Sequence, residues 1–291
     1  MSKLIIATHN GNFHADDVFS VAALKYLYPK ASVIRTRDVN ALNQADIVLD
    51  VGGVYDAEIG RFDHHQRGGA GKRDNGIPYS SFGLIWKKYG SQLCNNNVEL
   101  AKSVDNDLVS VIDAVDCGYV EGVPQGISLS QTIALFNPTW QENGDFDECF
   151  EQAVIFASQV LARFIAGAKG SNEAEAIVAN AIAQAADPRV IVLENFTPWK
   201  KTVHTLAPQA LYVIYPSESN QWRIQTVPVE PGSFEDRKPL PSAWAGLADN
   251  ELSKVIGIND ATFCHNGCFI AGAKSFTSIT TMAKIALTTE S

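Results

Sequence analysis

The sequence predicts an α/β fold, with a mainly parallel sheet flanked by helices, followed by a smaller α+β C-terminal domain. Short apolar runs alternate with helix-like segments in the first half of the chain, and prolines or glycines punctuate them. The last hundred residues instead hold strand-like runs and one terminal helix. Strands that alternate with helices usually form parallel sheets. With 291 residues, the chain is long enough for two domains.

Hydrophobic periodicity and helix-stop signals give the elements of the first domain in order. We expect strands at 4–7, 32–36 and 46–51, and helices at 18–27, 79–89, 99–114 and 150–186. The last of these is alanine-rich, and we expect a break in it near 167–170. Pro188 ends it, because proline cannot continue a helix. We therefore predict domains at 1–186 and 187–291.

The second domain is expected to open with a strand at 189–193. Two strand-like runs follow at 210–215 and 222–229, and a loop rich in proline and glycine covers 231–241. A turn of small residues at 270–273 then precedes a terminal helix at 278–287. This order is typical of a small α+β domain.

Composition and charge exclude several classes of protein. The formal net charge is −9, whereas proteins that hold long nucleic acid usually carry a basic surplus. No apolar run approaches the length of a membrane span, and the N-terminus does not resemble a secretory signal, so we expect no membrane partner. The five cysteines are an odd number without a CxxC pair, which favours a reducing cytoplasm over a disulfide framework.

Histidines and aspartates gather in the predicted first domain, where four of the six histidines lie within 65 residues. The candidate metal ligands are His9, His14, Asp16, Asp50, Asp63, His64, and Asp113 or Asp116. Imidazole and carboxylate together suit Mn²⁺, Zn²⁺ or Fe²⁺. More than four ligands indicate two ions, which can share a carboxylate and activate a water for phosphoryl displacement. Asp50 or Asp16 is the candidate for that shared carboxylate.

Other polar residues permit two interpretations each. Ser80 or Ser81 either caps the helix that follows or holds a phosphate at its N-terminus. Arg67, Lys72 and Arg73 form either a solvated loop or a positive surface for phosphates. In the second domain the candidates for substrate contact are Arg223, Arg237, His265 and Lys274. The tryptophans there either stack bases or pack in the core, namely Trp199, Trp222 and Trp244.

Eight segments spread over nearly the whole chain carry a family resemblance. They are residues 8–17, 62–66, 75–86, 113–116, 135–140, 198–200, 237–244 and 263–265, and the second contains Asp-His-His. Together they resemble the Myg exonuclease family, formerly described as metal-dependent protein hydrolases, within the DHH phosphoesterase superfamily. The resemblance implies a DHH-type metal-binding domain, and a C-terminal domain that closes over the metal site and selects the substrate.

The resemblance also implies residue roles. First-motif ligands would be His9, His14 and Asp16, although relatives in the wider superfamily have aspartate in place of His14. Asp50 would bridge the two ions, and Asp113 and Asp116 remain alternatives for the fourth motif. The implied catalytic set is Asp63, His64 and His65, in which His64 binds metal, Asp63 orients it or ligates directly, and His65 faces a phosphate or a metal. The implied substrate contacts are Arg67, Ser81, Arg237 and His265.

The expected function is therefore metal-dependent phosphoester hydrolysis by a water that two metals activate. The resemblance favours a cytoplasmic 3′→5′ exonuclease on single-stranded RNA or short oligonucleotides, with two Mn²⁺ (or Mg²⁺, Zn²⁺ or Fe²⁺) as cofactors. A first alternative is a hydrolase of small phosphate compounds, such as dinucleotides or pyrophosphate. A second is an inactive metal-binding regulatory protein. The sequence leaves the oligomeric state open, a homodimer included.

Overall fold

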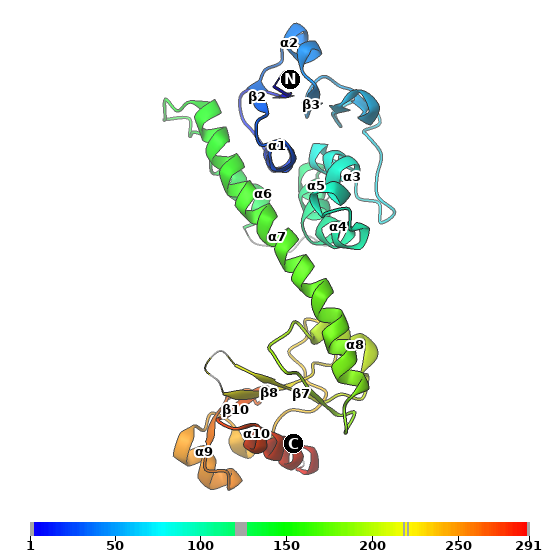
Figure 1. Ribbon diagram of the computed structural model, residues 1–291. Coiled ribbons are helices and arrows are strands. Elements are labelled where there is room, and N and C mark those ends of the chain that lie inside the picture. Colours follow the sequence, from blue (N-terminus) through cyan, green and yellow to red (C-terminus); the bar gives the residue numbers. More distant parts are fainter. Residues whose placement is uncertain (1–2, 120–126, 218, 220, 290–291) are drawn as a thin grey trace. The chain divides into compact units, whose positions relative to one another are not determined.

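The computed structural model describes residues 3–119, 127–217, 219 and 221–289, and the chain forms two compact units, Met1–Lys169 and Gly170–Ser291 (Figure 1). The division falls inside one helix, α7 (Phe146–Ala183). The predicted break near 167–170 is therefore wrong. A glycine inside a helix costs only about 1 kcal/mol relative to alanine, and the alanine-rich neighbours of Gly167 and Gly170 absorb that cost. The domain boundary after residue 186 remains a prediction.

The first unit is built on a five-stranded sheet of order β2-β1-β3-β5-β4. Its strands are β1 (Ile5–Thr8), β2 (Ser32–Arg35), β3 (Ile47–Leu49), β4 (Tyr55–Asp56) and β5 (Arg61–Phe62). Strands β2, β1, β3 and β5 run parallel to one another, whereas β4 pairs antiparallel with β5 at the edge. The sheet is thus mixed rather than parallel. A hairpin of two-residue strands is too short to show a periodic pattern, which is why the sequence did not indicate it.

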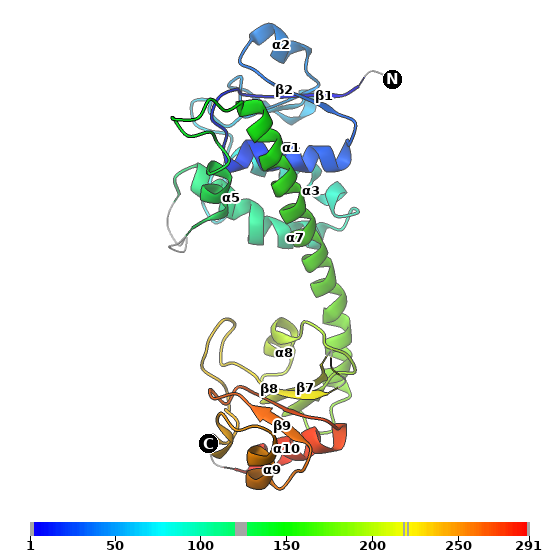
Figure 2. The ribbon, with the colours of Figure 1, turned by 90° about the vertical axis from the view of Figure 1, so that its left-hand side faces the viewer.

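Helices cover both faces of this sheet (Figures 1 and 2). The remaining helices of the unit are α1 (Ala15–Leu27), α2 (Val39–Gln44), α3 (Ser81–Leu93), α4 (Val98–Val104), α5 (Ser110–Asp116) and α6 (Leu129–Ala134). A short 3-10 turn (Ala57–Ile59) precedes β5, and a π-helical turn (Asp105–Val109) connects α4 to α5. On one face, α2 packs its Leu42 with Ala7 and Val48 of the sheet.

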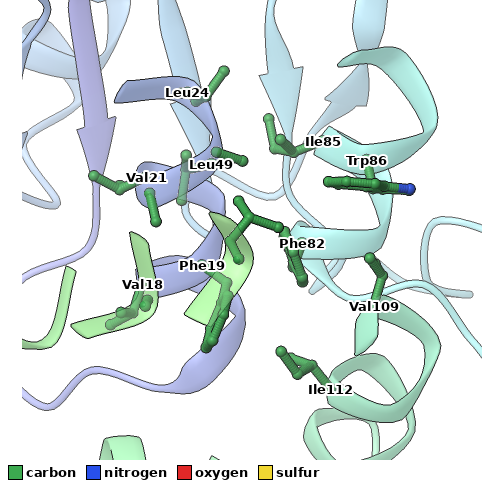
Figure 3. Close-up of a cluster of buried hydrophobic side chains, with 14 of the residues drawn as sticks. Val18, Phe19, Val21, Leu24, Leu49, Phe82, Ile85, Trp86, Val109 and Ile112 are labelled. Atoms are coloured by element: carbon green, nitrogen blue, oxygen red, sulfur yellow. The ribbon is translucent and has the colours of Figure 1, made fainter. Parts of the chain in front are cut away.

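On the other face, α1 and α3 form the main core with help from α5 (Figure 3). Phe19 of α1 meets Phe82 of α3, with ring centroids 5.5 Å apart, and Leu49 of β3 and Ile112 of α5 belong to the same cluster. Burying large apolar side chains of this kind contributes about 1.5–3 kcal/mol each. This core fixes α1 and α3 against the carboxyl ends of the strands.

The second unit contains a mixed sheet of order β6-β7-β8-β10-β9. Its elements are β6 (Val190–Val192), α8 (Lys200–Leu206), β7 (Tyr212–Pro216), β8 (Trp222–Thr226), a 3-10 turn (Ser242–Trp244), α9 (Asp249–Ile256), β9 (Ala261–Cys264), β10 (Ile270–Ala273) and α10 (Phe276–Thr288). The expected α+β content and terminal helix are therefore present. The small-residue segment 270–273 is a strand, not a turn, and Gly272 there leaves room for the Arg223 side chain of β8.

The tryptophans of the second unit mainly pack inside it. Trp199 and Trp244 are buried, and Trp222 lies against Phe276 with ring centroids 4.7 Å apart. These contacts favour the core interpretation over base stacking for Trp199 and Trp244.

One helix, α7, is long and apolar enough to cross a membrane by length and composition. The expectation that no apolar run approaches the length of a membrane span is therefore wrong for α7. Such a helix alone is weak support for a membrane span, because long core helices have the same composition. Phe150, Ala153 and Ala157 of α7 are buried in the core of the first unit, which accounts for part of its apolar character.

Candidate metal centre

Three neighbouring strands of the first unit end at the same edge of the sheet. His9 follows β1, Asp50 follows β3, and His64 lies two residues after β5. Because β1, β3 and β5 are adjacent and parallel, their carboxyl ends bring these side chains together. This is the edge at which ligands bind in open α/β sheets. The N-terminus of α1 adds Asp16 and Asp17 from its first turn.

Asp50 lies at the centre of the cluster, between two histidines. Its Oδ2 is 3.2 Å from Nε2 of His9, and its Oδ1 is 3.3 Å from Nε2 of His64. His9 Nε2 is also 3.3 Å from Asp17 Oδ2, and His64 Nε2 is 3.4 Å from Asp116 Oδ2 and 3.7 Å from Asp16 Oδ2. Each oxygen of one carboxylate therefore faces a different imidazole, which is the arrangement of a bridging ligand.

The backbone of Asp50 has an unusual conformation, with φ of +55°. Aspartate and asparagine tolerate this left-handed region better than most residues. The conformation turns the chain from β3 into Gly52 and Gly53, which also have positive φ. Ser81, the first residue of α3, donates its hydroxyl to Asp50 Oδ1 at 3.2 Å and so helps to hold the carboxylate.

Burial governs the charges of this cluster. It raises the pKa of Asp16 well above the ordinary value, and the negative charges of Asp50 and Asp116 add to the effect. It raises the pKa of Asp17 to about 7, although the charge of His9 opposes it. For His64 burial acts in the opposite direction, but the hydrogen bond and charge of Asp50 outweigh it and raise the pKa to about 10. Burial and mutual repulsion thus favour the protonated forms of Asp16 and Asp17 as long as no further positive charge is nearby.

Three polar atoms of the cluster are buried without a well-aligned hydrogen bond in the part of the chain that the structure describes. They are Asp16 Oδ1, Asp17 Oδ2 and His64 Nε2, although the last two have ion-pair neighbours at 3.3–3.7 Å. Buried polar atoms are normally paired, and an unpaired buried charge is costly. Imidazole nitrogens and carboxylate oxygens are the ligands that Mn²⁺, Fe²⁺ and Zn²⁺ take. The donor set and its unpaired atoms therefore fit divalent cations.

The potential ligand atoms form overlapping groups of three residues. Within each group, the ligand atoms all lie within 4.8 Å of one another. Among described residues these groups are His9-His14-Asp50, His14-Asp16-Asp116, Asp50-His64-His65, His64-Asp116-Cys117 and Asp16-Asp17-Asp50. The structure thus brings together most of the predicted ligands. It also adds Asp17, which the sequence analysis missed, although its position beside Asp16 in the first helical turn was a signal.

Asp113 and Asp116 have different surroundings. Asp116 lies 3.4 Å from His64, whereas Asp113 is buried among Arg73, the hydroxyl of Ser80 and the backbone N–H of Gly83. Burial raises the pKa of Asp113 to about 6 against the charge of Arg73. Of the two aspartates, the geometry favours Asp116 as a ligand and gives Asp113 an internal role.

Asp63 also has its oxygens engaged within the protein. Its Oδ2 accepts a hydrogen bond from the N–H of Gly53 at 2.6 Å, and its Oδ1 lies 2.9 Å from Nδ1 of His65. His65 is exposed, and its Nδ1 is also 3.4 Å from Asp50 Oδ1. Asp63 therefore orients His65 rather than His64, and it offers no oxygen to the groups of candidate ligands found among described residues.

The predicted substrate contacts fall in three kinds of environment. Arg67 is exposed in the loop after β5. Ser81 is buried and bonded to Asp50, and Ser80 is bonded to Asp113, so neither hydroxyl caps α3. In the second unit Arg237 donates to backbone carbonyls at the end of α8, including those of Ala207 and Ala210.

Two further candidates, His265 and Arg73, also differ in whether they are exposed or paired inside their unit. Exposed His265 packs on Phe269 in the second unit, with ring centroids 4.4 Å apart. In the first unit Arg73 pairs with Asp105 and Asp113 and lies over the ring of Tyr79. The guanidinium of Arg73 is therefore occupied inside the unit, unlike that of Arg67.

The packing of α3 against Asp113 predicts an effect of Gly83→Ala. A methyl group at this position would overlap the carboxylate of Asp113, which Arg73 and Ser80 hold in place. A helical glycine replaced by alanine usually gains roughly 0.5–1 kcal/mol, but here we expect a loss of about 1–3 kcal/mol. Urea unfolding measures it. Gly167→Ala, which meets no atom within 4 Å in α7, is the control and should not be destabilised.

The chain is similar to known proteins over almost its whole length. The chain matches the MYG1 exonuclease profile, described as "Uncharacterised protein family (UPF0160)", over residues 5–287. It is 36% identical to the human MYG1 exonuclease over 97% of this chain and 85% of that protein. It is 33% identical to a MYG1 protein of Schizosaccharomyces pombe over 99% of this chain and 98% of that protein.

A third relative is a MYG1 protein of Saccharomyces cerevisiae, 34% identical over 99% of this chain and 96% of its own length. No solved structure matches the chain significantly. A profile match over almost every residue, with one-third identity to proteins from human and two yeasts, shows that the chain belongs to the MYG1 exonuclease family.

Proposed function

We propose that this protein is a divalent-metal-dependent phosphoester hydrolase, and specifically a 3′→5′ exonuclease on single-stranded RNA or short oligonucleotides. The observation that carries the proposal is the buried cluster around Asp50, in which one carboxylate faces two imidazoles and the neighbouring carboxylates Asp16 and Asp17 each keep an oxygen without a well-aligned hydrogen bond. The exonuclease names of relatives, including the human protein, support a nuclease.

The ligand groups support two cation positions that share Asp50. His9, His14 and Asp50 would hold one cation, and Asp16, Asp50, His64 and Asp116 would hold the other. Two divalent cations would polarise a phosphoryl oxygen and lower the pKa of a water between them. The mixture of imidazole and carboxylate favours Mn²⁺, with Mg²⁺, Zn²⁺ and Fe²⁺ as alternatives.

The residues around the cluster would hold and protonate the substrate. Because Nδ1 of His65 faces Asp63, its Nε2 remains to face the substrate, and we propose that it protonates the leaving oxygen. Exposed Arg67 would contact a phosphate. Ser81 and Arg237 are not carried forward, because their side chains are bonded inside their own units.

A second candidate function is hydrolysis of a small phosphate compound, such as a dinucleotide or pyrophosphate. The net charge of −9 favours it, because a long polyanion would be repelled. Salt separates the two candidates, since affinity for a long strand falls steeply with ionic strength and affinity for a dinucleotide does not.

The five free cysteines are consistent with the cytoplasmic location that we propose.

The direct test is incubation with Mn²⁺ and 5′-labelled single-stranded RNA, with the products resolved on a gel. We expect a ladder that shortens from the 3′ end, is lost in EDTA, and is absent for Asp50→Asn, in which asparagine can keep the left-handed backbone. Intact RNA beside cleaved dinucleotide would support the second candidate. Activity that survives in Asp50→Asn, or in EDTA, would contradict both.

A further inference from the structure

The loop between β1 and α1 carries two of the proposed ligands, and a distant asparagine holds it. The side-chain amide of Asn137 makes a reciprocal pair with the backbone of Phe13. The N–H of Phe13 donates to Asn137 Oδ1 at 3.0 Å, and Asn137 Nδ2 donates to the carbonyl of Phe13 at 3.0 Å. The two residues are 124 positions apart in sequence, so the pair imitates one rung of a sheet between unrelated segments.

Asn137 is itself fixed at the end of α6. Its backbone N–H donates to the carbonyl of Ala134 at 3.2 Å, and its Nδ2 lies 3.3 Å from the same carbonyl. It belongs to the segment 135–140, which carries part of the family resemblance but contributes no candidate ligand. Aspartate would lose the donor to Phe13, and alanine would lose both groups.

The peptide that precedes His14 is therefore held by side chains at both of its ends. Phe13 is paired with Asn137, and the N–H of His14 itself donates to Asp17 Oδ1 at 2.9 Å. His14 is exposed, whereas Phe13 is fully buried and packs edge-on against Phe150. The direction of the His14 imidazole thus depends on the peptide geometry at 13–14 more than on the surroundings of the ring.

Two arginines also form hydrogen bonds with this loop, but at other residues than Asn137 does. Exposed Arg37 donates to Asn10, and Arg35, whose side chain is 3% exposed, donates to the carbonyl of Gly11. These contacts hold the first half of the loop, on the side of His9. Several described side chains form hydrogen bonds with this loop. Among them, Asn137 is the one that bonds to Phe13, the residue before His14, and it lies outside the strands and α1.

We infer that Asn137 is a positioning residue, which sets His14 for cation binding by pinning the peptide that precedes it. The inference rests on the proposed function, because it assumes that His14 is a ligand. Its consequence is selective. Loss of Asn137 should weaken most the position of His9, His14 and Asp50. The other position keeps the four ligands Asp16, Asp50, His64 and Asp116 and should keep most of its affinity, although His14 also lies within reach of Asp16 and Asp116.

Mn²⁺ titration of the full chain, followed by calorimetry and by the electron paramagnetic resonance of free Mn²⁺, tests this. We expect wild type to bind two ions, and Asn137→Ala to bind one of them on the order of 10–100-fold more weakly. His14→Ala should weaken the same position, and the double variant should be no weaker than His14→Ala alone. Asn137→Asp, which keeps the acceptor for the Phe13 N–H, should fall between wild type and Asn137→Ala.

The control is Asn180→Ala in α7, where the exposed side chain accepts a hydrogen bond from Gln184 and belongs to none of the candidate ligand groups among described residues, so both affinities should stay at wild-type values. The inference would be overturned if Asn137→Ala bound both ions as tightly as wild type does, or if both positions were weakened by the same factor. Failure of the wild-type protein to bind two ions would instead overturn the proposed function. The two failures are therefore distinguishable in one titration.

Discussion

Asp16→Asn should abolish metal-dependent hydrolysis and, in EDTA, raise the melting temperature of the protein. Asp16 is fully buried, its Oδ1 has no hydrogen-bond partner among described residues, and burial together with Asp50 and Asp116 raises its pKa. Asparagine keeps the shape but removes the charge, so repulsion in the cluster falls. We expect activity to fall on the order of 10²–10³-fold or more, because a proposed ligand of the cation that would stabilise charge in the transition state is lost.

The stability gain of Asp16→Asn should depend on pH in a defined direction. Because the pKa of Asp16 is raised in the folded state, the charge of this residue destabilises the fold once the pH exceeds the ordinary carboxyl pKa. The gain should therefore be absent at low pH and grow as pH rises. Exposed Asp107→Asn is the matched control, with activity and melting temperature unchanged. A lower melting temperature in EDTA would mean that the charge of Asp16 stabilises the metal-free cluster, contrary to this prediction.

Arg73→Met should cost the first unit about 3–5 kcal/mol of unfolding free energy, the usual result of leaving a buried charge unpaired. The side chain of Arg73 is 8% exposed and pairs with Asp105 and with fully buried Asp113. Hydrogen bonds and charges of these partners outweigh burial and raise the pKa of Arg73 above its ordinary value. Methionine preserves the volume of the stem but leaves Asp113 without its cation.

Urea unfolding followed by circular dichroism measures this loss. Arg73→Met combined with Asp113→Asn should recover part of it, because the orphaned charge is then removed. Lys88→Met breaks the exposed pair with Glu58 in the same unit and should leave the midpoint unchanged. If Arg73→Met were as stable as Lys88→Met, the Arg73 pair would be a surface contact, and the loop from 67 to 73 would be free to serve the substrate instead.

The candidate site was largely predictable because its ligands stand at strand ends. His9, Asp50 and His64 each follow a short apolar run, and adjacent parallel strands bring such ends together. Asp17 escaped notice because the sequence does not reveal that a second first-turn aspartate also points inward. The pattern could show which residue types gather but not which oxygen each histidine faces.

The choice between Asp113 and Asp116 depends on contacts far away in the sequence. Both lie in α5, three residues apart, so helical periodicity places them on neighbouring faces. Arg73 decides between them by pairing with Asp113 from a loop 40 residues earlier. The roles of Ser81 and Asn137 were hidden for the same reason, since each bonds to a segment at least 31 residues away.

With the proposed cations bound, the buried oxygens of Asp16 and Asp17 would couple the lifetime of the folded chain to the supply of those cations. A ligand that binds only the folded state stabilises it by about 2.7 kcal/mol at 100 times its dissociation constant. Proteases remove the unfolded fraction, so changes of about 1–2 kcal/mol alter cellular abundance several-fold. Cells starved of the cation would therefore hold less of this protein at an unchanged rate of synthesis, and its level would report metal supply.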